Sequence, residues 1–129
     1  MNPILAPFDN QKYLSLETFR RNGVGVPTPV WFASDAGTST LYVYTTADAG
    51  KAKRIRANGT VRIAPCDARG KISGAWIDAR ATIADGREFD LGMRLLGQKY
   101  SLKWLLDVSA RLFRPRPRVV FAIQVAEMP

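Results

Sequence analysis

The sequence predicts a mainly β fold with short helices, in which antiparallel strands close into a small barrel or partial barrel. Six stretches rich in β-branched and aromatic residues alternate as half-buried strands do: 13–19, 24–34, 41–46, 61–65, 72–84 and 119–125. One further segment, 85–113, instead carries leucines at helical spacing. Antiparallel strands with short connections favour a closed or partly closed sheet, because closure removes exposed strand edges.

The first two strands are expected to form a hairpin after an irregular N-terminal arm, residues 1–12. The strand 13–19 leads into Asn22-Gly23, and both of these residues tolerate positive φ. Asn-Gly between two alternating stretches is a strong signal for a tight turn between antiparallel neighbours.

The second strand, 24–34, contains two prolines, Pro27 and Pro29. Proline has no N–H to donate, so this strand must include a sheet edge or a bulge. Backbone around residues 28–31 is then open to a ligand. The alternative is an ordinary edge strand with no ligand.

The third strand, 41–46, passes through a turn of small residues into a short basic helix beginning at Lys51. Ala52 and Ile55 are spaced to face a core, and Lys51 and Arg54 share another face near the helix start. Backbone N–H groups without helical partners and the helix dipole make such a turn suitable for a phosphate or carboxylate. The alternative is a solvated basic helix face.

The second half of the chain continues the sheet and adds the main helical segment. Asn58-Gly59 predicts an αL-type cap at the end of the basic helix. Gly97 and the cap signal at Ser101 divide the segment 85–113 into two helices. A final strand, 119–125, completes the fold.

Composition limits the classes of function. The chain of 129 residues contains no histidine and one cysteine, Cys66, which excludes histidine-based triads and disfavours zinc or iron–sulfur sites. Cys66 lies in an apolar run and is expected to be a buried structural thiol. The net charge of +8 indicates an anionic partner. The length of 129 residues predicts a single domain over residues 1–129. We expect a cytoplasmic location, because a lone cysteine fits a reducing compartment and neither a membrane span nor a signal peptide is evident.

Five stretches in order resemble a known family. They are FRRNG from Phe19, TPVWF from Thr28, LYVYTT from Leu41, KAKRIRAN from Lys51, and APCDARG from Ala64 with the strand GAWIDARA that follows it. Together they resemble the split β-barrel flavin and deazaflavin oxidoreductases related to pyridoxamine 5′-phosphate oxidase, and especially the branch that uses coenzyme F420. The resemblance covers residues 13–84 well and implies a six-stranded antiparallel split β-barrel of the FMN-binding type.

The resemblance also implies a homodimer with the cofactor in a groove between subunits. Lys51 matches the phosphate-binding lysine of the family, with Lys53 and Arg54 beside it to steer an anionic tail. Thr45 and Thr46 match the strand end beside the phosphate. The ring-lining strand is matched by Thr28, Pro29, Val30 and Trp31. The oxidases carry Ser-Arg before this lysine, where Ala49-Gly50 stand here, so the resemblance favours F420 over FMN.

The resemblance implies an oxidoreductase that passes a hydride from reduced F420 to a small unsaturated or quinone-like acceptor. No proton donor is evident: Tyr44 is a candidate by type alone, and Trp31 and Trp76 are candidate walls for a flat substrate. The alternatives are a non-catalytic carrier of flavin or F420, and an FMN-dependent oxidase. A basic nucleic-acid binder is disfavoured because few aromatic residues lie among the cations.

Overall fold

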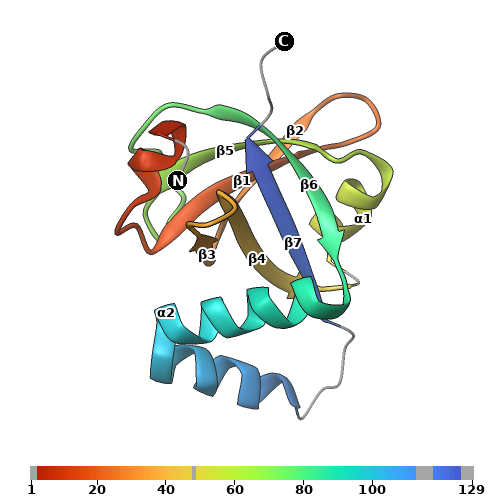
Figure 1. The fold of residues 1–129 in the computed structure, drawn as a ribbon. Helices are drawn as coiled ribbons and strands as arrows, with labels where there is room; N and C mark the ends of the chain where they lie inside the picture. Colours follow the sequence, from red (N-terminus) through yellow and green to blue (C-terminus); the bar gives the residue numbers. More distant parts are fainter. Residues whose placement is uncertain (1–2, 48, 113–117, 126–129) are drawn as a thin grey trace.

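In the computed structural model, which describes residues 3–47, 49–112 and 118–125, seven strands form one antiparallel sheet. The strands are β1 (Tyr13–Phe19), β2 (Gly25–Val30), β3 (Phe32–Asp35), β4 (Thr40–Thr46), β5 (Thr60–Cys66), β6 (Ile77–Ala84) and β7 (Arg118–Val125). Their order across the sheet is β2-β1-β5-β6-β7-β4-β3 (Figure 1). The predicted mainly β class is confirmed.

The barrel closes at Trp31. The segment 24–34, predicted as one strand, is two strands, and this accounts for seven strands where six were expected. Its first half, β2, pairs with β1, and its second half, β3, pairs with β4. These halves are the two edges of the sheet, so the chain itself joins one edge to the other at Trp31.

The predicted proline edge is confirmed by the register of β2. The N–H of Arg20 donates to the carbonyl of Val24 at 2.9 Å, so in this hairpin the even-numbered residues are the hydrogen-bonded pairs. The backbone of Thr28 therefore faces β1, whereas the backbone of Pro27 and Pro29 faces outward. Neither proline removes a bond from the ladder. The predicted Asn-Gly turn is also present, with Gly23 at a φ of +89°.

The N-terminal arm is more ordered than expected. Residues Pro3–Phe8 form a 3₁₀ helix, η1, in which Leu5 and Phe8 are buried. Both side chains belong to the main core inside the barrel, and the ring of Phe8 meets Phe32 edge to face at 6.1 Å. Two apolar residues in this short arm are enough to hold it on the barrel.

Helix α1 (Gly50–Ala57) packs on the barrel through Ala52 and Ile55, as predicted, and contacts β1 and β6. The prediction of an αL-type cap at Asn58-Gly59 is wrong. Asn58 is extended, with φ −151° and ψ 110°, and its side-chain Oδ1 accepts the N–H of Thr60 at 3.0 Å. This local bond directs the chain into β5 without a left-handed residue.

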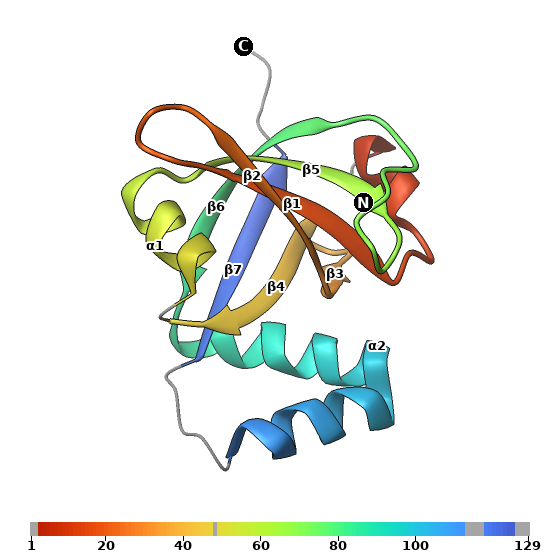
Figure 2. The ribbon, with the colours of Figure 1, turned by 180° about the vertical axis from the view of Figure 1, so that it is seen from behind.

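Helix α2 (Gly86–Leu112) lies against the outside of the barrel, on β3, β4 and β7 (Figure 1). Helical residues run without a break from Gly86 to Leu112. The ribbon turns back within this length in both Figure 1 and Figure 2, so the division that was expected between two helices is a sharp bend within one helical segment. Gly92 allows the close approach, because a Cβ there would lie 2.8 Å from Val120. No helix in the described part of the chain has the length and apolar character needed to cross a membrane.

Candidate functional site

The start of α1 gathers positive charge. Nε of Arg54 donates to Oγ1 of Thr18 at 2.6 Å, which fixes the guanidinium on β1. A Cβ on Gly50 would lie 2.9 Å from Nη1 of Arg54, so the glycine makes room for the guanidinium beside the helix start. Lys51 is half-buried in the same turn, and the first turn holds no acidic residue. These cations add to the positive end of the helix dipole and favour an anion there.

The other residues predicted around this turn are only partly gathered there. Thr46 ends β4, and its carbonyl accepts the N–H of Ala49, which links the strand end to the helix. Thr45 is buried and pairs with Val119 of β7. Lys53 is exposed. The turn therefore offers Lys51 and Arg54 as ordered cations and Lys53 as a solvated one.

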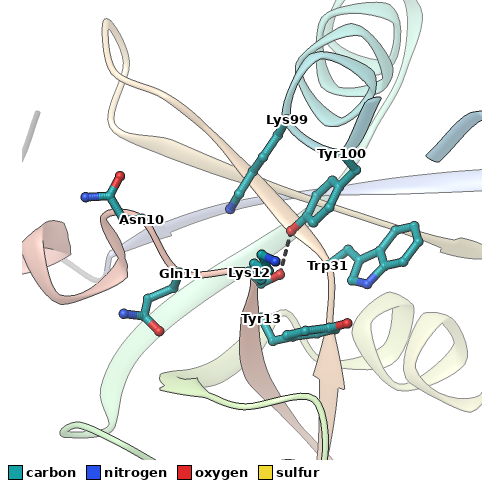
Figure 3. Close-up of a pocket in the computed structure, with 7 residues that line it drawn as sticks. All are labelled: Asn10, Gln11, Lys12, Tyr13, Trp31, Lys99 and Tyr100. Atoms are coloured by element: carbon teal, nitrogen blue, oxygen red, sulfur yellow. Dashed lines mark hydrogen bonds between the residues drawn. The ribbon is translucent and has the colours of Figure 1, made fainter. Parts of the chain in front are cut away.

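A second candidate site is a cavity of about 380 Å³ beside α2 (Figure 3). It is lined by Asn10, Gln11, Lys12, Tyr13, Trp31, Lys99 and Tyr100. Of these, the sequence analysis singled out Trp31 alone. Among the described lining residues are two lysines and three aromatic residues, and none of those described is acidic.

The hydroxyl of Tyr100 ties together the corner where β2 gives way to β3. It accepts the N–H of Phe32 at 2.9 Å. It also lies 2.8 Å from the carbonyl of Phe32 and 2.7 Å from that of Lys12, and donates its one proton to either of them. Burial, above all, raises the pKa of Tyr100 to about 12, so the hydroxyl stays neutral and acts as a structural link.

Lys99 lies next to Tyr100 and turns its ammonium inward. The residue as a whole is exposed, yet Nζ lies 3.5 Å from the ring centroid of Phe32, which is fully buried, and 5.3 Å from that of Tyr100. Burial lowers the pKa of Lys99 to about 8. The two aromatic faces act in the opposite direction, because ring quadrupoles favour the charged form.

Trp31 forms one wall of this cavity and stacks on Tyr100, with ring centroids 4.9 Å apart and planes 15° apart. Trp76, the other candidate wall, belongs to a different cluster. The guanidinium of Arg62 lies 5.0 Å from its ring centroid, and Arg62 pairs with Glu17 at 2.6 Å. Tyr44, the candidate proton donor, packs against the hydrophobic cluster that Ala33 of β3 forms with Leu96 of α2. The contacts of this cluster are those of a core side chain.

Strand β2 connects the two sites. Thr18, which holds Arg54, pairs with Val26 near the beginning of β2, and Trp31 follows its last residue, Val30. Six residues of strand span roughly 20 Å. Figure 2 shows α1 and the η1 end of the barrel on opposite flanks, with β2 running between them. The predicted site residues thus form two groups at the two ends of one edge strand.

A neighbouring cavity of about 440 Å³ shares residues 10–13 with the first and reaches Cys66. Cys66 is buried, as predicted. Burial, and then the charge of Asp67, raise the pKa of its thiol, which opposes the thiolate that a nucleophile needs.

Comparison with known proteins is consistent with this fold. The family model described as pyridoxamine 5′-phosphate oxidase matches residues 4–128. None of the curated proteins matches the sequence.

Solved structures of this fold resemble the chain over nearly its whole length. The heme storage protein HutZ of Vibrio cholerae is 16% identical with a TM-score of 0.71, covering 97% of this chain and 89% of that one. A conserved hypothetical protein of Mycobacterium tuberculosis is 18% identical with a TM-score of 0.69, covering 96% and 79%. A Clostridium acetobutylicum protein related to general stress protein 26 is 13% identical with a TM-score of 0.65, covering 92% and 78%. The predicted split-barrel fold is confirmed.

Proposed function

The chain belongs to the pyridoxamine 5′-phosphate oxidase family, and we propose that it is an oxidoreductase that uses reduced coenzyme F420. The deazaflavin supplies a hydride when it is bound, and the acceptor is a small unsaturated or quinone-like molecule. The protein contributes binding, orientation and exclusion of water, as is usual for cofactor enzymes.

The observation that carries this proposal is the distribution of charge and aromatic surface along β2. Arg54 and Lys51 lie at one end of the strand, and the indole of Trp31 follows its other end, beside the aromatic cavity. A cofactor with an anionic tail and a flat ring needs these two environments separated by a span of this kind. We therefore assign the tail to Lys51 and Arg54, with Thr46 beside them, and the ring to Thr28–Trp31.

The start of α1 fits a diffuse anion better than a compact phosphate. Ala49, the N-cap residue, makes no side-chain cap bond, and Gly50 has no side chain to add a donor beyond its backbone N–H. The ordered cation there, Arg54, is held by Thr18 and keeps a fixed position. The phosphodiester and glutamate tail of F420 spreads its charge over more length than FMN does, and so needs fewer groups at any one point.

The outward edge of β2 adds a constraint on the ring. Pro27 and Pro29 present carbonyl oxygens outward but no N–H, and the backbone of Thr28 between them faces β1. A ring bound along this edge is held through its own N–H groups. We expect it to lie flat against Pro29 and Trp31.

Cofactor retention tests the proposal. The protein is incubated with F420 or with FMN, passed through gel filtration, and its absorption spectrum recorded. Retention of F420 and loss of FMN is the expected result, whereas retention of FMN alone contradicts the choice of F420. Anaerobic oxidation of reduced F420 is then followed with a panel of quinone-like and unsaturated acceptors.

The second candidate function is a non-catalytic carrier, and it is favoured by the bonding and the pKa of the Tyr100 hydroxyl in the cavity. The hydroxyl of Tyr100 is engaged with backbone groups, and its pKa of about 12 makes it a poor proton donor at neutral pH. Binding of F420 without turnover of any acceptor would establish this role. Some similar structures are heme proteins, but this chain has no histidine to ligate heme iron.

We also propose that the protein is a homodimer, because the groove of related proteins lies between subunits. A stable isologous interface buries on the order of 1,600 Å² in total. Sedimentation at micromolar concentration should show the dimer, and a monomer alone at that concentration would contradict the proposal.

A further inference from the structure

We propose that the cavity at Lys99 is a binding site for a planar aromatic carboxylate. All the residues that are described in the lining of the cavity belong to this chain, and the proposed binding does not require a bound cofactor. Identifying its occupant as the hydride acceptor rests on the proposed function; the binding itself does not.

The first reason is the chemistry of the lining. Tyr13, Trp31 and Tyr100 supply aromatic surface, and Lys12 and Lys99 supply positive charge (Figure 3). The remaining lining residues, Asn10 and Gln11, are neutral amides that can donate to a carboxylate. A cavity of about 380 Å³ is within the range of small-molecule sites.

The second reason is the direction of Lys99. Lysine side chains on an exposed helix normally extend the ammonium into water. Here Nζ instead lies on the face of buried Phe32, at 3.5 Å from its ring centroid, beside a cavity that also has aromatic residues in its lining. Among the residues that the structure describes, no carboxylate forms an ion pair with this ammonium. A bound carboxylate would provide that counter-charge.

The third reason is that the enclosure is rigid. The hydroxyl of Tyr100 is bonded to backbone on both β3 and the residue before β1, and its ring is stacked on Trp31. Lys99 is the next residue on the same helix. Its position is therefore set before any ligand arrives, which lowers the ordering cost of binding.

Binding should couple to proton uptake by Lys99. The charged groups and phenols that line the cavity with Lys99 are, among the described residues, Lys12, Tyr13 and Tyr100, and burial lowers the pKa of Lys99 to about 8. A carboxylate beside the ammonium favours its charged form. Affinity should thus be highest below pH 8 and fall as the pH rises above it.

The probes are 2-naphthoate and its uncharged counterpart 2-naphthamide, titrated by calorimetry into the cofactor-free protein. We expect naphthoate to bind about ten- to hundred-fold more tightly than naphthamide, the usual worth of a charge-assisted contact. Lys99→Met should remove that preference. Arg94→Met, a loss of one cation from an exposed position on the same helix, should leave it within about twofold.

Two further measurements, a pH titration and a measurement of proton uptake, test the proposal independently of the Lys99→Met variant. If Lys99→Met fails to fold, titration of the wild type from pH 6 to pH 10 replaces it, with loss of affinity above pH 8 as the expected result. Proton uptake at pH 8, measured in two buffers of different ionisation enthalpy, should accompany naphthoate and not naphthamide. Equal affinity for the two probes, or no binding of either at millimolar concentration, overturns the proposal. Neither outcome bears on whether F420 is retained in gel filtration.

Discussion

The two basic regions of this protein hold their charges in opposite ways. At the start of α1, Lys51 and Arg54 are half-buried, Arg54 is tied by one bond to Thr18, and Lys53 is exposed. In the cavity beside α2 the ammonium of Lys99 lies against aromatic rings. The first region places its charges beside polar groups and solvent, and the second places its charge on aromatic faces.

This difference indicates which condition each region responds to. Exposed charges are screened by salt over a Debye length of about 8 Å at physiological ionic strength. Lys99 is screened less, and its pKa of about 8 makes it sensitive to mild alkali. Salt should therefore test α1, and pH should test the cavity.

The largest effect is expected from Lys51→Ala. Loss of a charge-assisted contact to the cofactor tail should weaken F420 affinity about ten- to hundred-fold, with little change in fold stability. Fluorescence titration at two salt concentrations measures this, and the wild type should lose affinity with salt more steeply than the variant. Unchanged affinity in the variant would mean that the start of α1 is only a solvated face.

Next in size is Tyr100→Phe, which removes the hydroxyl at the corner between β2 and β3. The N–H of Phe32 loses its acceptor, so the free energy of unfolding should fall by about 1–2 kcal/mol. Tyr42→Phe is the matched control, because that hydroxyl makes only a long bond of 3.4 Å to Glu88. A loss no larger for Tyr100→Phe than for Tyr42→Phe would contradict the proposed link.

A pH-dependent change is expected from Lys99→Met. The pKa of Lys99 falls from 10.5 to about 8 in the folded protein. Between these values the unfolded chain holds the proton that the folded chain has released, so wild-type stability should rise with pH there. The variant should lack this rise. Denaturant unfolding at pH 8 and pH 10 tests it.

Above pH 10 stability should fall with pH in both proteins, which serves as an internal check. The pKa values of Tyr42 and Tyr100 are raised to about 12. Their unfolded forms ionise first, so stability should be lost between pH 10 and pH 12 with or without Lys99.

The smallest effect is expected from Lys53→Ala. Lys53 is exposed, and its contribution to F420 affinity is a screened long-range attraction. We expect a loss below about threefold, removed by added salt. A loss as large as that of Lys51→Ala would show that both lysines contact the tail directly.

Local signals in the sequence were sufficient for most of the sheet and for the start of α1. The Asn22-Gly23 turn, the proline edge and the inward face of Ala52 and Ile55 all depend on neighbours within a few residues. The division at Trp31 was not predictable this way, because β2 and β3 are each defined by a different partner strand. Alternation alone cannot reveal a change of partner.

The cavity at Lys99 was missed for a related reason. Tyr100 reaches the backbone of Lys12 and Phe32, which are remote in sequence, and helical spacing in 85–113 directed attention to its leucines. A lysine next to a tyrosine in a helix carries no distinguishing pattern. What makes the pair notable is the buried ring of Phe32 beneath it, which only the folded chain supplies.

The prolines of β2 also restrict how copies of this protein can associate. Edge strands usually recruit further strands because they present alternating donors and acceptors. Between residues 26 and 30 this edge presents acceptors alone, since its outward positions are Pro27 and Pro29. A second copy cannot extend the sheet there by strand addition. A dimer cannot therefore form by strand pairing along β2, and this edge of the sheet is protected against open-ended sheet growth.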